Sequence, residues 1–99
     1  MQLKIHDVYS IKISNGDELV AKVMADDGDT ITVSSPLTVL PGPNGIQLIP
    51  SLFTADLDAV VTINKANISL FAEVREQVRD SYIESTTGIA PVRKQIITG

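Results

Sequence analysis

The sequence predicts a mainly β protein, with at least five strands in a small barrel or strongly twisted sheet, followed by a C-terminal α-helix. Two observations lead to this fold class. Between residues 9 and 71, short runs of alternating apolar and polar residues are separated by turn residues, a pattern typical of a meander of strands that closes into a small barrel. After residue 71, the apolar residues recur at the spacing of a helix. A chain of 99 residues fits a single domain, 1–99.

The first two strands are expected to form a hairpin around Asn15-Gly16. Apolar and polar residues alternate in residues 9–14 and again in residues 19–24, so each run has one face for a core. Asn15 and Gly16 both tolerate positive φ, which is why this dipeptide is a strong hairpin signal. Residues 1–8 show no clear period and fit either a short helix or an extended segment.

The remaining strand regions are expected at residues 30–40, 46–53, 60–63 and 68–71, because each is rich in apolar or β-branched residues. Pro36 lies inside the first of these regions. Since proline cannot donate a ladder hydrogen bond, that strand must bend, bulge or reach an edge there.

The last third of the chain predicts a helix over residues 72–85. Its apolar face is formed by Phe71, Val74, Val78 and Tyr82, whose spacings of three and four match one side of a helix. Gly88 is expected to end the helix. Residues 88–99 carry no period and predict a loose tail.

The composition narrows the function. The chain has no cysteine, which excludes thiol catalysis and thiolate metal sites, and no phosphate-cradling or nucleophile motif is present. We therefore expect neither an enzyme nor a bound cofactor. No apolar run approaches the roughly 20 residues that span a bilayer, and the N-terminal residues lack a signal-peptide core. We expect a cytoplasmic protein without membrane contact.

Two other features of the composition concern possible ligands. A formal charge of −4 argues against a surface that coats phosphates over a wide area, so any nucleic-acid site must be local. The aromatic residues are few, and core packing is favoured over base stacking for Tyr9 and Phe53.

Two motifs of this chain resemble the Sm-like (Lsm) family. The first is IKISNGDELVAKVMADDGDTITVSSPLTV, residues 11–39, with a strand, an Asn-Gly turn, a long second strand, an acidic loop and a third strand. The second is AVVTINKANISLF, residues 59–71, with a short β-branched strand, a tight polar loop and a final strand that begins with isoleucine. The resemblance implies a five-stranded, strongly bent antiparallel Sm-like barrel over about residues 9–71, followed by the C-terminal α-helix.

The resemblance also implies an assembly and a ligand. Sm-like proteins form rings in which the fourth strand of one copy pairs with the fifth strand of the next. The resemblance therefore implies a homo-oligomeric ring of about five to seven copies with cyclic symmetry. It also implies that the ring binds RNA or single-stranded DNA and acts in nucleic-acid processing or as a chaperone. The compact architecture is similar to that of Sm-like proteins of phage or environmental origin. A phage origin would place this protein in the cytoplasm of a host cell.

The same resemblance implies the site residues. Asp26 matches the acidic residue of the family's first motif, and Thr30 stands where the family has asparagine four positions later. Asn64, Lys65 and Asn67 precede the final strand, where the family has Arg-Gly-Asn or Arg-Gly-Asp. Amides and an ammonium group can hold a phosphate and a base edge. The alternative is a polar turn whose asparagines hydrogen-bond their own backbone.

Other charged residues favour structural interpretations. The run containing Asp26, Asp27 and Asp29 lacks the spacing of a calcium loop, so a solvated acidic turn is favoured over a metal site. His6 is the single histidine and is expected at the surface. Arg75 and Arg79 are spaced to share a helix face, where ion pairs with local acids are favoured over a cationic stripe.

A second function class stays open at this point. A structural or adaptor protein of a phage, without affinity for nucleic acid, fits the negative charge and the absence of the family's arginine from residues 64–67.

Overall fold

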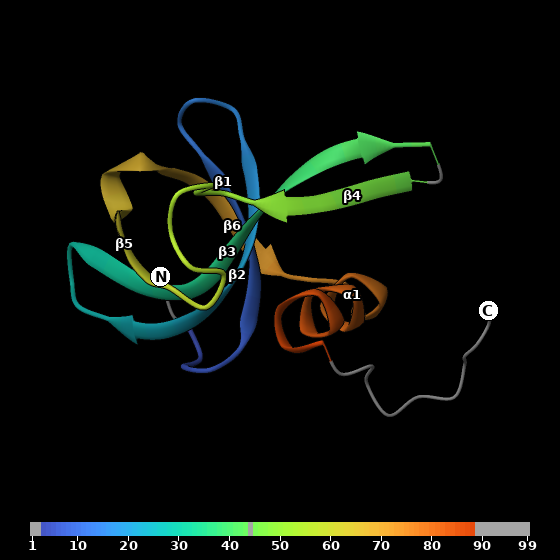
Figure 1. Cartoon of the computed structure of the whole chain (residues 1–99). Coiled ribbons are helices and arrows are strands. Elements are labelled where there is room, and N and C mark those ends of the chain that lie inside the picture. Colours follow the sequence, from blue (N-terminus) through green and yellow to red (C-terminus); the bar gives the residue numbers. More distant parts are fainter. Residues whose placement is uncertain (1–2, 44, 89–99) are drawn as a thin grey trace.

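The computed structural model describes residues 3–43 and 45–88, which form one antiparallel sheet and one helix (Figure 1). The mainly β class with a C-terminal helix is confirmed. Its elements are β1 (Val8–Ile13), β2 (Glu18–Asp26), β3 (Thr30–Gly42), β4 (Gly45–Pro50), β5 (Val60–Asn64), the 3₁₀ turn η1 (Lys65–Asn67), β6 (Ile68–Glu73) and α1 (Glu76–Thr87).

The sheet has the order β4-β3-β2-β1-β6, with β5 also paired to β3. The six strands lie on the six segments expected from the sequence, whereas the family barrel has five. β3 is long enough to pair with β5 along its first half and with β4 along its second half. Within the described residues, β4, β5 and β6 each pair along one edge only, β4 and β5 with β3 and β6 with β1. The sheet is therefore open between β5 and β6.

A bend at Ser35-Pro36 lets β3 change partners. Two residues of β3, Ser35 and Pro36, stand opposite the single residue Ala21 of β2, which is the geometry of a β-bulge. Ser35 has a φ of 52°, and its N–H donates to the carbonyl of Ala59 at 3.0 Å. The bend or bulge expected at Pro36 is confirmed.

The first hairpin closes through a three-residue loop. Gly16 has a φ of 97°, and its N–H donates to the carbonyl of Ile13 at 2.9 Å. Asn15 keeps negative φ and uses its side-chain oxygen to accept the N–H of Asp17 at 2.9 Å. The hairpin at Asn15-Gly16 is confirmed, but only the glycine adopts the positive φ that both residues tolerate.

An inner core fills the concave side of the curled sheet. Its buried members are Tyr9, Ile11, Leu19, Ala21, Val23, Ile31 and Val33. Side chains from both β5 and β6 pack against it. Since the two end strands contribute to one cluster, the sheet curls toward a barrel although no ladder joins them.

A second, outer core lies between the sheet and α1. It contains Val8, Val20, Leu37 and Tyr82, with Val39, Leu48, Val74, Val78 and Ile83 packed against them. The expected helix face is confirmed for Val78 and Tyr82, whereas Val74 packs against the same core from the segment before the helix. Phe71 is a correction: it belongs to β6 and contacts the inner core, where its ring meets that of Tyr9 edge-on.

The helix limits differ from the predicted residues 72–85 at both ends, and the helix ends at Thr87. The helix begins at Glu76 instead of residue 72, because Ala72 and Glu73 still pair with β1. Gly88 caps the helix in the left-handed conformation with a φ of 74°, as expected. The tail predicted after Gly88 lies outside the described residues.

The second half of β3 and β4 form an arm that projects from the sheet beside α1 (Figure 1). Opposite residues in this ladder share a face. One face of the arm is entirely apolar, formed by Leu37, Val39, Pro41, Ile46, Leu48 and Pro50. The helix covers the base of this face, and the exposed Ile46 shows that its outer end is open.

Candidate nucleic-acid interface

The structure brings four of the five predicted site residues together. Asp26 ends β2, Thr30 begins β3 and Asn64 ends β5. Thr30 and Asn64 stand opposite each other in the β3–β5 ladder. Lys65 follows at once, and its N–H donates to the carbonyl of Asp29 at 2.9 Å. The curl of the sheet therefore places the acidic turn beside the polar turn that follows β5.

Asn67 lies at the other end of this turn. Its carbonyl accepts the N–H of Ser14 at 2.7 Å, so the end of η1 is held by the β1–β2 hairpin. Lys65 and Asn67 thus attach the turn to two different hairpins. The side chains of Asn64 and Asn67 remain exposed, and their amides can donate to and accept from a base edge.

Lys65 is paired with Asp26. The Lys65 Nζ lies 2.5 Å from the Asp26 Oδ1, and the two side chains are 20% and 25% exposed. The hydrogen bond from Lys65 holds the pKa of Asp26 below its ordinary value. The charge of Lys65 is therefore already matched, and a phosphate must displace Asp26 or share Lys65 with it.

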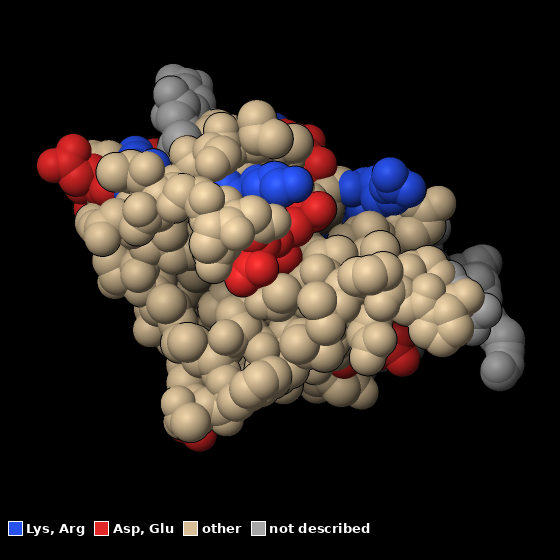
Figure 2. All heavy atoms as spheres, turned by 90° about the horizontal axis from the view of Figure 1, so that it is seen from above, with Lys and Arg blue, Asp and Glu red and all other residues tan. Residues whose placement is uncertain are grey.

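The charges around this site do not form a broad basic surface. The two turns carry three aspartates, Asp26, Asp27 and Asp29, against Lys65. Figure 2 shows cations lying beside carboxylates on one face of the molecule, with a large area that carries neither. This site therefore offers a ligand exposed amides and one paired lysine, and no broad positive surface.

Arg79 was expected to pair with local acids, His6 to lie at the surface, and the acidic turn between β2 and β3 not to bind a metal ion. Arg79 Nη2 lies 3.9 Å from Asp7 Oδ1, and both side chains are partly exposed. His6 is exposed, and its backbone N–H donates to the carbonyl of Val23 at 2.6 Å. Within residues 3–43 and 45–88, no group of three or more metal-ligating side chains is placed to hold a metal ion.

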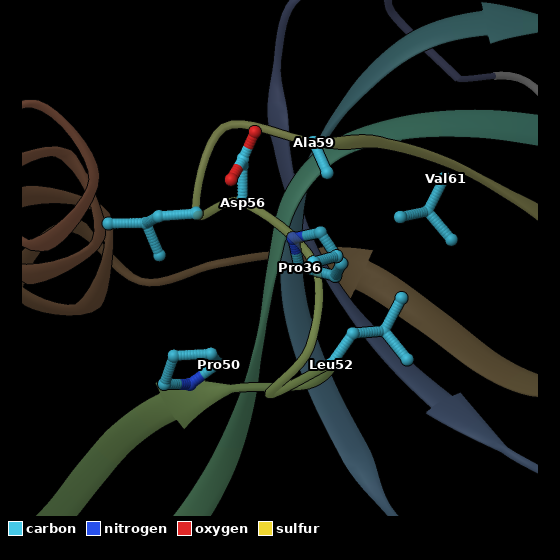
Figure 3. Close-up of a pocket in the computed structure, with 8 residues that line it drawn as sticks. Pro36, Pro50, Leu52, Asp56, Ala59 and Val61 are labelled. Atoms are coloured by element: carbon cyan, nitrogen blue, oxygen red, sulfur yellow. The ribbon is translucent and has the colours of Figure 1, made fainter.

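Sequence reasoning missed an exposed apolar loop. Phe53, expected in the core, is 79% exposed, and this expectation was wrong. Phe53 lies in residues 51–59, between β4 and β5, where Leu52 and Leu57 are also exposed. These two leucines line a small hollow with Pro36, Pro50 and Val61 (Figure 3). Pro50 and the turn-rich sequence of residues 54–58 were signals that the strand expected over residues 46–53 ends before Phe53, as it does at Pro50.

No known protein family and no curated protein sequence matches this chain. In the part of the chain that the structure describes, no helix is long and apolar enough to cross a membrane.

Proposed function

We propose that this chain is an Sm-like protein that assembles into a homo-oligomeric ring and binds single-stranded nucleic acid, RNA or DNA, at the turn formed by residues 64–67. It acts in nucleic-acid processing or as a chaperone, without catalysing a reaction, in the cytoplasm of a host cell. The observation that carries the proposal is the convergence of Asp26, Thr30, Asn64 and Lys65 from three strands.

The strand edges support assembly. The free edges of β5 and β6 lie at the two sides of the open sheet, and an unpaired edge invites another strand. Val60 on β5 and Leu70 on β6 are 63% and 66% exposed. Pairing β5 of one copy with β6 of the next would satisfy both edges, cover these side chains and repeat with cyclic symmetry.

The assembly strengthens the binding proposal. One copy offers two exposed amides and a lysine that is already paired, which is a weak site. In a ring of five to seven copies the same turn recurs on every copy. A strand that contacts several turns gains affinity from each added contact without a new kind of interaction.

The test combines native mass with oligonucleotide binding. Light scattering over a concentration series should give five to seven times the 10.6 kDa of one copy. Binding of a labelled single strand at low salt should weaken in Lys65→Ala, and the dependence of log affinity on log salt should fall by about 1. Lys12→Ala removes the same charge from β1, outside the turn, and should bind as the unmodified chain does.

Two results would contradict the proposal. A persistent monomer would remove the ring, and unchanged binding in Lys65→Ala would remove the assigned site.

The Lys65–Asp26 pair favours a second candidate, a structural or adaptor protein of a phage without nucleic-acid affinity. With its ammonium group matched inside the molecule, Lys65 would then serve to hold η1 against the β2–β3 turn. This candidate predicts no measurable oligonucleotide binding in either the unmodified chain or Lys65→Ala, and a protein partner that contacts α1 or the tail.

A further inference from the structure

A groove runs between the β3–β4 arm, α1 and the outer face of the sheet. Its volume is about 680 Å³. Val20, Val39, Ile46 and Val78 line it with apolar surface, while Glu18, Glu73 and Arg75 supply charged groups. Ile46 is 53% exposed. The groove is large enough to hold an aromatic side chain, whereas the hollow between Pro36 and Pro50 is only about 10 Å³.

The loop of residues 51–59 offers such a side chain. Phe53 is the most exposed of the large apolar residues in the described part of the chain. Exposed aromatic residues that fill a partner's pocket are the typical anchors of protein interfaces. Leu52 stands beside Phe53 and is also exposed, so the loop presents a small apolar protrusion.

The topology brings this protrusion to the groove of the next copy. The loop leads directly into Val60, the first residue of β5, and Glu73, the last residue of β6, lines the groove. In an antiparallel pair, the first residues of one strand stand opposite the last residues of the other. Pairing β5 with β6 of the next copy therefore sets the loop of the first copy beside the groove of the second.

We propose that Phe53 of one copy inserts into the groove between the arm and α1 of the neighbouring copy. The occupant of the groove is thus a second copy of this chain. The proposal rests on the ring proposed above and names the side-chain contact that joins its successive copies. Each copy carries both a protrusion and a groove, so the contact is head-to-tail and repeats around the ring.

Disulfide trapping tests the contact directly, because the chain has no cysteine of its own. The double variant Phe53→Cys with Ile46→Cys should, on oxidation, give a ladder of covalently joined copies on a non-reducing gel. A disulfide within one chain joins no second copy, so only a contact between copies produces the ladder. The control pairs Phe53→Cys with Ile5→Cys, an exposed residue outside the groove, and should give no ladder.

A second variant measures how much the contact matters. Phe53→Ser should raise the concentration at which the ring forms by about tenfold or more, with an unchanged circular dichroism spectrum because Phe53 is exposed. Ile5→Ser removes a matched exposed apolar side chain and should leave this concentration unchanged.

The outcomes separate this inference from the proposed function. A ring that forms without a ladder, and that Phe53→Ser does not weaken, would overturn the Phe53 contact and leave the ring standing. A monomeric unmodified chain would overturn both. A ladder from Phe53→Cys with Ile46→Cys, absent from the Ile5→Cys control, would establish the contact whatever the chain's affinity for nucleic acid.

Discussion

Lys65 and Asp26 hold each other at the place where a nucleic acid is proposed to bind. A phosphate and a carboxylate compete for the same ammonium group, because both are anions that accept its hydrogen bonds. Asp26 therefore acts against phosphate binding while it positions Lys65. The strength of the site depends on this competition as much as on the lysine itself.

Replacing Asp26 with asparagine should strengthen oligonucleotide binding. The amide retains an oxygen that can accept from Lys65, but it removes the competing charge. We expect several-fold tighter binding at low salt, measured by fluorescence anisotropy, with the gain declining as salt screens the phosphates. Glu84→Gln makes the same change of charge on α1 and should have no effect. Weaker binding in Asp26→Asn would mean that the carboxylate itself contacts the nucleic acid.

The same pair makes a small, pH-dependent contribution to stability. The pKa of Asp26 is lowered in the folded chain, mainly by the hydrogen bond from Lys65. The contribution is therefore present above the ordinary aspartate value of about 3.9 and is lost as the pH falls through the lower, folded value. Urea unfolding would give the free energy of unfolding of the unmodified chain and of Asp26→Asn. The difference between these two free energies should be constant near neutral pH and vanish in acid. If the difference in free energy persists at a pH below the folded pKa of Asp26, the lost ion pair is not its cause.

The bend of β3 and the attachment of α1 depend on each other. At the bulge, the carbonyl of Ser34 and the N–H of Lys22 both turn to the Tyr82 hydroxyl, which donates to the first at 2.7 Å and accepts from the second at 3.1 Å. The helix thus satisfies backbone groups beside the position where two strands lose register. Burial of this ring raises the pKa of Tyr82.

Tyr82→Phe should consequently destabilise the fold by about 1–3 kcal/mol, because it leaves a backbone donor and acceptor without their partner. The measurement is chemical unfolding followed by circular dichroism. Tyr9→Phe is the matched control: its hydroxyl accepts one hydrogen bond, from the Lys4 N–H, and its loss should cost about 1 kcal/mol or less. Equal losses in the two variants would show that the bulge is satisfied in another way.

Local signals in the sequence were enough for much of this architecture. Gly16 and Gly88 permit positive φ and Pro36 cannot donate a ladder hydrogen bond, whatever surrounds them, and the turn, the cap and the bend at these residues were predicted. The start of α1 was not, because Ala72 and Glu73 suit a helix but are held by pairing with β1. The exposure of Phe53 also escaped prediction, since it depends on which segments cover the loop.

The candidate site was predictable only in part. The resemblance placed Asp26 and Thr30 near residues 64–67, and the ladder between Thr30 and Asn64 agrees with that placement. The ion pair between Asp26 and Lys65 was not predicted, because 39 residues separate them in the chain. Such a contact follows from the curl of the whole sheet and has no local signal.

In the proposed assembly, the acidic charge of the molecule and the weakness of one site make the number of contacts decisive. Oligonucleotides of increasing length should therefore show a step in affinity, of about tenfold or more, once a strand reaches the turns of two neighbouring copies. Anisotropy titrations with a single-stranded homopolymer series would measure this. Affinity that rises only in proportion to length would indicate independent sites, and dilution below the assembly concentration should abolish the step.

The two cores of the fold each contain one tyrosine, Tyr9 in the inner core and Tyr82 in the outer core, and the chain has no tryptophan. Each layer thus carries one tyrosine, whose near-ultraviolet band is separate from that of phenylalanine. In the tyrosine band, the near-ultraviolet spectrum of Tyr9→Phe would report on the layer beneath α1, and that of Tyr82→Phe on the curled sheet. Coincident melting curves from the two variants, after allowance for their different stabilities, would show that both layers unfold as one cooperative unit.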